Sequence, residues 1–261
     1  MLLKPKKSLG QNFLHDKNII DKIIQTSGIN NKDVVLEIGP GTGNLTKFII
    51  NQKPKKLYVI EKDFRLAQDL EKKFLNQANI IVKDVLKIPE GFYSGKKFLI
   101  LGNLPYNIST KILSTWCLSD KLKVSKMILM FQKEVADRIT ADVNSRDYSR
   151  ITILSNWKFD VKKIIDVRPN SFFPKPKVNS TVLEFIPKKK IHPIKDPKNL
   201  ERITRVFFSQ RRKMIKKPIK FLFKNYKFNF NKIDIKPTDR PQNINIHKYL
   251  KIVNEYELLG N

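Results

Sequence analysis

The stretch VVLEIGPGTG, residues 34–43, decides the fold of this chain. Its first five residues form an apolar run of the length of a buried β-strand, and glycines then follow at every second position. Glycine at such positions permits a tight turn and lets a ligand approach the backbone closely. The stretch therefore predicts a strand, a glycine-rich turn and the start of a helix.

The glycine turn differs from two familiar phosphate-binding turns. A dinucleotide-binding turn would have a glycine where this chain has Asn44, and no lysine pattern of a P-loop follows. A G-x-G-x-G turn headed by Glu37 suits an adenosine without a pyrophosphate, which would lie against Gly39, Gly41 and Gly43. A turn of this kind can also serve only to connect a strand to a helix.

Apolar runs alternate with amphipathic runs on both sides of this turn. Alternation of this length indicates a doubly wound α/β sheet of parallel strands, a Rossmann-like fold. Strands are predicted at residues 34–38, 57–60, 80–82, 98–101 and 127–131, and helices at residues 45–51, 64–75, 109–118 and 133–140.

The pattern changes in the last part of the chain. Residues 151–157 and 178–185 have the composition of strands and flank a proline-rich loop, which predicts an antiparallel C-terminal hairpin on the sheet. The run at 187–190 then marks a boundary. We predict a first domain at residues 1–187 and a small helical domain at 188–261, with basic helices at 200–217, 219–224 and 246–257.

Acidic residues lie at the ends of three successive predicted strands, and Glu37 at the head of the glycine turn is the first of them. Glu61 ends the second strand, 22 residues after Gly39, and Asp84 follows the third. A carboxylate at position 61 can accept both hydroxyls of a ribose, and one at position 84 can accept the exocyclic amine of adenine. Acids at strand ends are often merely exposed, but several beside one glycine turn favour a nucleoside site at the carboxyl edge of the sheet.

The fourth strand leads into Asn103-Leu104-Pro105-Tyr106. The Asn103 amide oxygen and the Leu104 carbonyl beside Pro105 can accept the two N–H bonds of a planar exocyclic amine. The Tyr106 ring can stack on the base that carries this amine. These four residues predict a catalytic site that holds the N6 amine of an extruded adenine.

Two further segments allow more than one interpretation. Phe172 and Phe173 could close the other face of the base, or both could be core aromatics. The segment GQNFL, residues 10–14, could fold over the crevice as a lid with a polar grip from Asn12. Taken alone, it suggests a mobile terminus anchored by Phe13.

The chain is strongly basic and its charge is unevenly distributed. Its 261 residues include 52 basic and 24 acidic side chains, a net charge of +28. Residues 187–261 supply +14 of this charge, as much as residues 1–186. Lysine-rich codon usage alone would not concentrate charge in this way, so we expect a nucleic-acid partner.

The remaining composition excludes several classes of protein. Cys117 is the only cysteine, so no intramolecular disulfide can form, and the three scattered histidines predict no metal site. No apolar stretch approaches membrane-spanning length, and the first residues lack the apolar core of a signal peptide. We expect a soluble cytoplasmic protein, without a membrane partner and monomeric.

Eight segments, in order, match the pattern of one enzyme family. The chain resembles the bacterial ribosomal RNA adenine N6-dimethyltransferases, the dimethyladenosine transferases whose loss confers kasugamycin resistance. The resemblance runs from about residue 7 to about residue 250. The matching segments are residues 10–14, 37–43, 59–61, 102–109, 131–135, 148–152, 172–178 and 208–213.

The resemblance implies a class I methyltransferase that uses S-adenosylmethionine. Its substrate would be two adjacent adenines of small-subunit (16S) ribosomal RNA, methylated at N6 during ribosome biogenesis. The resemblance also implies that Asn12 binds the cofactor, which replaces the interpretation of this segment as a mobile terminus. We include its neighbour Gln11 among the candidate cofactor contacts. The cofactor contacts that the family implies are Asn12, Leu14, Gly39, Glu61, Asp84 and Asn103.

The basic C-terminal region is expected to bind RNA phosphates. The residues predicted to do so are Arg205, Arg211, Arg212 and Lys213, although a solvated helix face would carry similar charges. Two departures from the family pattern, Gln242 in place of an acid and Pro218 in a helical run, bear on RNA docking only. Two alternatives stay open: a large-subunit adenine methyltransferase of the antibiotic-resistance type, and a non-catalytic RNA-binding assembly factor.

Overall fold

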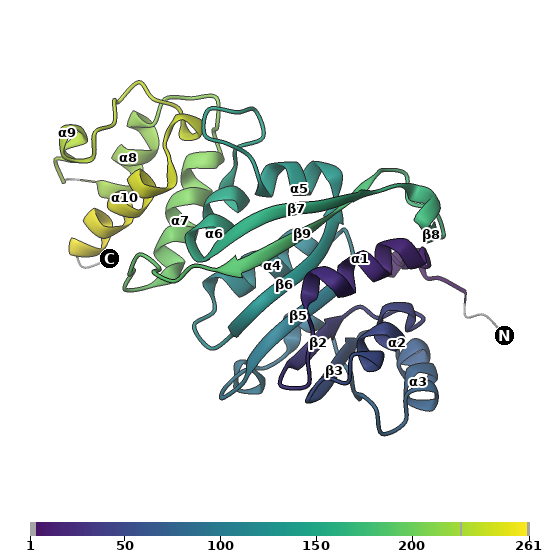
Figure 1. Ribbon diagram of the computed structural model, residues 1–261. Helices are drawn as coiled ribbons and strands as arrows, with labels where there is room; N and C mark the ends of the chain where they lie inside the picture. The colour runs from purple at the N-terminus through teal and green to yellow at the C-terminus, as the bar shows by residue number, and fades with distance from the viewer. Residues whose placement is uncertain (1–3, 225, 260–261) are drawn as a thin grey trace. The chain divides into compact units, whose positions relative to one another are not determined.

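The computed structural model describes residues 4–224 and 226–259, which form two compact units (Figure 1). The first unit contains the residues up to 116 together with 120–136 and 161–187. The second contains 117–119, 137–160 and the residues from 188 onward. Residues 137–160, which the predicted division placed in the first domain, group with the C-terminal helices because α6 (Arg150–Lys158) packs against α7 (Pro197–Phe208) and α10 (Ile246–Leu258).

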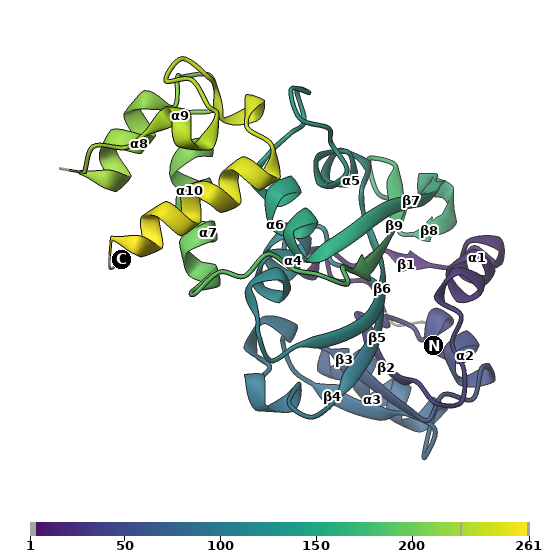
Figure 2. The same cartoon turned by 60° about the vertical axis from the view of Figure 1, so that its left-hand side comes forward.

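A seven-stranded sheet in the order β4-β3-β2-β5-β6-β9-β7 organises the first unit (Figure 2). The pairs β2–β3, β3–β4, β2–β5 and β5–β6 are parallel, and β9 is antiparallel to β6. The predicted Rossmann-like sheet with an antiparallel C-terminal hairpin is therefore confirmed. The strands are β2 Val34–Ile38, β3 Lys56–Glu61, β4 Asn79–Val82, β5 Lys97–Asn103, β6 Lys123–Gln132, β7 Phe159–Val167 and β9 Ser180–Pro187.

The four helices predicted among and directly after the parallel strands are present. They are α2 Asn44–Asn51, α3 Phe64–Lys73, α4 Ser109–Leu118 and α5 Lys133–Ile139. The sequence interpretation missed α1 (Lys17–Ser27), which begins at the N-cap Asp16 and ends at Gly28 in the left-handed conformation. The Asp16 side chain accepts from the backbone N–H groups of Asn18 and Ile19, which satisfies donors at the start of the helix.

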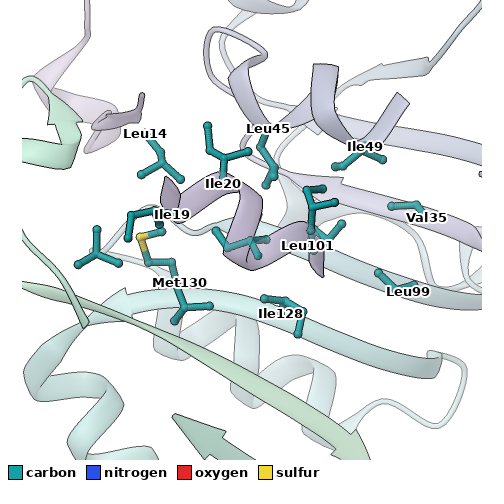
Figure 3. Close-up of a cluster of buried hydrophobic side chains, with 14 of the residues drawn as sticks. Leu14, Ile19, Ile20, Val35, Leu45, Ile49, Leu99, Leu101, Ile128 and Met130 are labelled. Carbon is teal, nitrogen blue, oxygen red and sulfur yellow. The ribbon is translucent and has the colours of Figure 1, made fainter. Parts of the chain in front are cut away.

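The core that supports the pocket lies between α1, α2 and one face of the sheet (Figure 3). Ile20 of α1 and Ile49 of α2 are at most 1% exposed, and they belong to one buried cluster with Val35 and Leu101 of the central strands. Burial of such a side chain stabilises the fold by about 1.5–3 kcal/mol. The central strands are buried on both faces, which explains why they are continuous apolar runs rather than alternating ones.

The prediction of a strand at residues 151–157 was wrong, because this segment is helix α6. The first strand of the C-terminal hairpin is β7, immediately after the helix. The β-branched composition suggested a strand, but nearly every side chain from Ile151 to Trp157 is buried, so no helical period shows in the sequence. A capping box fixes the helix start, since the Ser149 N–H donates to Thr152 Oγ1 over 2.9 Å.

The prediction of one helix over residues 200–217 was also wrong. The segment contains the end of α7 and the start of α8 (Lys216–Phe223), joined by turns. The backbone N–H of Ile215 donates to the carbonyl of Asp239 over 2.8 Å, which diverts the chain from the axis of α7. Pro218 lies in the first turn of α8, where a missing N–H costs nothing.

The second unit is helical. Besides α6, α7, α8 and α10 it contains the short helix α9 (Phe230–Ile233). Its internal anchor is the buried carboxylate of Glu257 in α10, which accepts the backbone N–H groups of Lys195 and Asp196 at 3.0 Å each. None of the helices that the structure describes is long and apolar enough to cross a bilayer.

Candidate active site

One pocket at the carboxyl edge of the parallel sheet collects most of the predicted site residues. The glycine turn follows β2, Glu61 ends β3, Asp84 follows β4, and Asn103 ends β5. Because the carboxyl ends of parallel strands meet at one edge, these residues become neighbours despite their separation in sequence. The predicted residues that line the pocket are Gln11, Asn12, Leu14, Gly39, Gly41, Glu61, Asp84, Asn103, Leu104, Pro105 and Tyr106.

The glycine turn makes room for other parts of the chain. Gly39 and Gly41 have φ angles of +65° and +59°, and both line the pocket. A Cβ atom on Gly41 would lie 2.6 Å from the ring of Phe13, and one on Gly39 would lie 3.3 Å from the carbonyl of Asn103. The glycines therefore let the N-terminal segment and the end of β5 approach the turn closely.

Gly43, the last glycine of the turn, packs against α3. It is absent from the pocket lining, and its φ angle is +85°. A Cβ atom here would lie 2.6 Å from the ring of Phe74 and 2.8 Å from Leu70, both at the end of α3. The lack of a side chain at position 43 thus serves packing against α3, and a cofactor contact at Gly43 stays a prediction.

Glu61 is a buried carboxylate with two backbone donors. Its Oε2 accepts the N–H of Gly41 at 3.3 Å, and its Oε1 accepts the N–H of Asp63 at 2.8 Å. Burial raises the pKa of Glu61 above its ordinary value. Each carboxylate oxygen can accept a further hydrogen bond, so the group suits a ligand with two adjacent hydroxyls.

Asp84 lies beside a cation at the same edge. Its Oδ1 accepts the N–H of Leu86 at 3.0 Å, and its Oδ2 lies 2.9 Å from Lys62 Nζ. Burial opposes ionisation, but the bonds from Lys62 and Leu86 lower the pKa of Asp84 below its ordinary value. Asp84 is therefore an ionised acceptor at the pocket wall, and Lys62, which also lines the pocket, was not predicted.

Glu37, which the sequence interpretation placed at the head of the glycine turn without a cofactor contact, lines the pocket. Its side chain is 1% exposed, and Oε2 has no hydrogen-bond partner among the residues that the structure describes. Burial raises its pKa to about 8. An acid at the head of the glycine turn was the available signal. A buried carboxyl oxygen without a partner fits a pocket whose ligand carries positive charge or a hydrogen-bond donor.

The Asn103 amide is held in one orientation by the N-terminal segment. Its Nδ2 donates to the backbone carbonyl of Asn12 over 2.8 Å. Since the oxygen of an amide lies opposite its nitrogen, Oδ1 remains an acceptor for another group. Assignment of the two amide atoms follows from this bond, because only the nitrogen can donate to a carbonyl.

The residues after Asn103 are also fixed. Leu104 is buried, and the Tyr106 hydroxyl lies 2.6 Å from Ser180 Oγ. Burial raises the pKa of Tyr106, so its phenol is neutral at physiological pH. The Ser109 hydroxyl, at the start of α4, donates to the Tyr106 carbonyl over 3.2 Å. These contacts hold the aromatic ring beside the amide.

The two phenylalanines have different environments. Phe172 is 1% exposed and belongs to the hydrophobic core, so the structure contradicts a base-covering role for it. Phe173 is 63% exposed and pairs with Phe13 where the short strands β1 (Phe13–Leu14) and β8 (Phe172–Phe173) meet. Neighbouring residues of a strand point to opposite faces, which explains the difference. A role for Phe173 at the base stays a prediction.

The predicted RNA-binding residues belong to the second unit. Arg205 lies on α7, and the other three lie in the turns between α7 and α8. Arg212 and Lys213 are exposed, whereas Arg211 is half-buried and donates to the carbonyl of Arg146. Arg211 therefore braces the chain before α6 in addition to any contact with RNA.

Comparisons with known proteins identify the family. The family model of the ribosomal RNA adenine dimethylases matches residues 2–258. The chain is 53% identical to the ribosomal RNA small subunit methyltransferase A of Pelagibacter ubique, over 98% of each chain. It is 36% identical to the protein of the same name from Agrobacterium fabrum, over 97% of this chain and 93% of that one.

One solved structure agrees with this assignment, and a second shares the fold. A dimethyladenosine transferase from Plasmodium falciparum superposes with a TM-score of 0.82 at 28% identity, covering 95% of this chain and 98% of that one. The 23S rRNA methyltransferase ErmE superposes with a TM-score of 0.68 at 22% identity, covering 94% and 100%, and shows the fold alone. The resemblance inferred from the motifs is confirmed. This chain belongs to the ribosomal RNA adenine dimethylase family, and it is a methyltransferase.

Proposed function

We propose that this protein transfers methyl groups from S-adenosylmethionine to N6 of two adjacent adenines in small-subunit (16S) ribosomal RNA. It acts as a cytoplasmic monomer during ribosome biogenesis. The names of relatives that match the whole chain support the small subunit as the substrate. The observation that carries the proposal is the Asn103 amide, whose nitrogen is engaged by Asn12 and whose oxygen is left as an acceptor beside Tyr106.

The pocket fits S-adenosylmethionine, a cationic adenosine derivative. Glu61 suits the ribose hydroxyls, and Asp84 suits the exocyclic amine of the cofactor's adenine. The buried carboxyl of Glu37 suits the positive charge of the methionine part. Asn12, Leu14, Gly39 and Asn103 complete the set that would hold the cofactor. When bound, S-adenosylmethionine supplies an electrophilic methyl group.

The acceptor half of the site activates a poor nucleophile. The lone pair of an adenine amine is delocalised into the ring, so the planar amine reacts slowly. Asn103 Oδ1 and the Leu104 carbonyl accept its two N–H bonds, which favours a pyramidal nitrogen whose lone pair leaves the ring plane. Tyr106 stacks on the extruded base and fixes its tilt. The methylated nitrogen is acidic and loses its proton afterwards, so no residue has to act as general base.

The second unit supplies affinity for RNA rather than chemistry. Its exposed cations, Arg205, Arg212 and Lys213 among them, suit RNA phosphates. A non-catalytic assembly factor would not need the polar contacts that fix the Asn103 amide. A large-subunit substrate has no support beyond a shared fold.

The proposal is tested by incubating the protein with unmethylated small ribosomal subunits and a donor with a labelled methyl group. Modified nucleosides are then mapped by mass spectrometry of nuclease fragments. We expect dimethyladenosine at two neighbouring positions of the small-subunit RNA, and no label in large subunits treated in parallel. Label in the large subunit alone, or in neither subunit, would contradict the proposal.

A further inference from the structure

The N-terminal segment, residues 4–14, is tied to the pocket at two separate places. One tie joins it to Asp63, two residues after β3, and the other joins it to Asn103, at the end of β5. Gln11 and Asn12, which are neighbours in the sequence, make the two ties. This arrangement connects the donor side of the pocket to the acceptor side.

The first tie centres on a buried carboxylate. Asp63 is 3% exposed, and its Oδ2 accepts Gln11 Nε2 at 3.1 Å. Its Oδ1 lies 3.5 Å from Lys6 Nζ, and Arg65 donates to both oxygens. Bonds from Arg65 and Gln11 lower the pKa of Asp63 below its ordinary value. The carboxylate is therefore ionised whenever the segment is held.

The Gln11 amide has no freedom to turn over in this arrangement. Its Oε1 accepts the backbone N–H of Lys6 at 2.6 Å, while its Nε2 donates to Asp63. A reversed amide would place an oxygen against a carboxylate, which is repulsive. Gln11 thus lines the pocket, but its polar atoms serve the segment itself and Asp63 rather than a ligand.

The second tie sets the amide of Asn103. Asn12 presents its backbone carbonyl to Asn103 Nδ2 over 2.8 Å. Two residues further on, the Leu14 carbonyl accepts Asn44 Nδ2 at 2.8 Å, which holds the segment next to α2. The position of the Asn12 carbonyl, and so the direction of the Asn103 oxygen, depends on where the segment is held.

A chain of contacts consequently runs through the pocket. The Asp63 N–H donates to Glu61, the Asp63 side chain accepts from Gln11, and Asn103 donates to the carbonyl of Asn12, which follows Gln11. Glu61 belongs to the donor site and Asn103 to the acceptor site. Since the contact between Asn12 and Asn103 joins residues 91 apart, local chain geometry does not enforce it.

We infer that Gln11 and Asp63 are positioning residues that hold the N-terminal segment so that Asn12 fixes the Asn103 amide for catalysis. The inference rests on the proposed role of Asn103 in binding the adenine amine. Without the Asn12 carbonyl, the amide can turn over and present its own N–H groups to the N–H groups of the substrate. That orientation removes the acceptor and slows transfer by about 10- to 100-fold.

A series of substitutions at Gln11 tests this inference. Gln11→Lys keeps a donor for Asp63, Gln11→Met removes it, and Gln11→Glu places a second carboxylate against it. Lys7→Gln is the control, since Lys7 is an exposed residue of the same segment. These changes leave Asp63 free to cap α3, so the fold is not at risk.

We expect kcat at saturating donor and RNA to decrease in the order wild type, Lys, Met, Glu. Gln11→Lys should stay within about threefold of the wild type, and Gln11→Glu should fall by about 10- to 100-fold. Lys7→Gln should be unchanged. If Gln11→Lys is as impaired as Gln11→Glu, or if Gln11→Glu is fully active, Gln11 does not act through Asp63.

A second measurement needs no activity. Amide hydrogen exchange, followed without donor or RNA, should show faster exchange at Leu9 and Gly10 in Gln11→Glu, because their N–H groups bond to carbonyls within the segment. The side-chain amide resonance of Asn103 should also broaden. Unchanged exchange and an unchanged resonance would overturn the inference even if the enzyme is active. An inactive wild type with the expected exchange would instead refute only the proposed function.

Discussion

The pocket of the first unit and the basic surface of the second use charged side chains in opposite ways. Glu61 in the pocket and Asp63 beside it are both less than 9% exposed, and each accepts hydrogen bonds from fixed donors. In the second unit, Arg212 and Lys213 are exposed, and residues 202–233 include no acidic residue at all. Buried groups with fixed partners suit chemistry that depends on geometry, whereas exposed like charges suit a polyanion bound by counterion release.

Glu257 shows that burial of a carboxylate does not by itself mark an active site. It is 6% exposed and accepts two backbone N–H groups, much as Glu61 does. The difference is that Glu257 also accepts the Asn199 side chain and lies outside the pocket at the sheet edge, so that its bonds tie α10 to the start of α7. The comparison predicts that changes in the pocket alter the rate, and that changes in the basic surface alter RNA affinity.

The largest effect is expected from Asn103→Ala, which removes the acceptor for the adenine amine. Transfer should fall by roughly 10³-fold, equivalent to about 4 kcal/mol of transition-state stabilisation. Single-turnover transfer to small subunits measures the rate, and filter binding measures RNA affinity. RNA affinity should stay within about twofold. A variant that loses RNA binding but keeps its turnover would contradict the assignment of catalysis to the first unit and of RNA affinity to the second.

Glu37 should make stability depend on pH. Its pKa rises from 4.5 in the unfolded chain to about 8 when buried. The folded state therefore holds the proton more tightly. The contribution of protonated Glu37 to the free energy of unfolding is complete below pH 4.5 and is lost as the pH rises towards 8. The free energy of unfolding without donor should fall by about 3 kcal/mol between pH 5.5 and 8.

Urea unfolding of the wild type and of Glu37→Gln across this range measures the effect. The free energy of unfolding of the variant should not fall with pH in this way, because glutamine does not titrate. In the presence of donor, whose positive charge favours the carboxylate, the wild-type slope should flatten. Equal slopes for both proteins would mean that Glu37 does not bind its proton as inferred.

Gly41→Ala separates backbone strain from a clash in the pocket. Gly28 is the matched control, because both glycines have positive φ angles, +59° and +63°, but a Cβ atom on Gly28 meets nothing within 4 Å. Each substitution should cost about 1 kcal/mol of stability. Gly41→Ala should also displace Phe13 and weaken donor binding by roughly 30-fold, about 2 kcal/mol, as measured by calorimetry. Equal donor affinity in the two variants would contradict the packing of Phe13 on the turn.

The smallest effect is expected from Arg212→Ala combined with Lys213→Ala. RNA affinity should fall about tenfold, and the slope of log affinity against log salt should decrease by about 0.7 per lost phosphate contact. Donor affinity and kcat should not change. Lys22→Ala with Lys32→Ala removes the same charge from exposed sites of the first unit. If that pair weakens RNA binding equally, overall charge rather than a defined surface binds the RNA.

Much of the pocket could be predicted from the sequence because its signals are local. The glycine turn, Glu61, Asp84 and Asn103 each follow an apolar strand, and parallel topology then brings them together. The same reasoning failed for α6, since a helix buried on all sides shows no period. It also left Phe172 open between the base and the core, because the direction of that side chain depends on the pairing of β1 with β8.

The long-range hydrogen bonds of the N-terminal segment could not be predicted from the sequence. The bond between Asn12 and Asn103 spans 91 residues, and that between Gln11 and Asp63 spans 52. Neither leaves a periodic or compositional trace, because each uses one polar atom at one position. The motif around Gln11 was therefore recognisable, but the inferred role of Gln11 in holding the N-terminal segment was not.

The central claim is that one pocket holds the methyl donor and an Asn103 amide whose oxygen is directed at the acceptor. A crystal structure with S-adenosylmethionine bound tests it most directly. The account predicts the ribose hydroxyls on Glu61, and Asn103 Nδ2 still on the carbonyl of Asn12. A donor bound elsewhere, or an Asn103 amide turned away from the pocket, would contradict it.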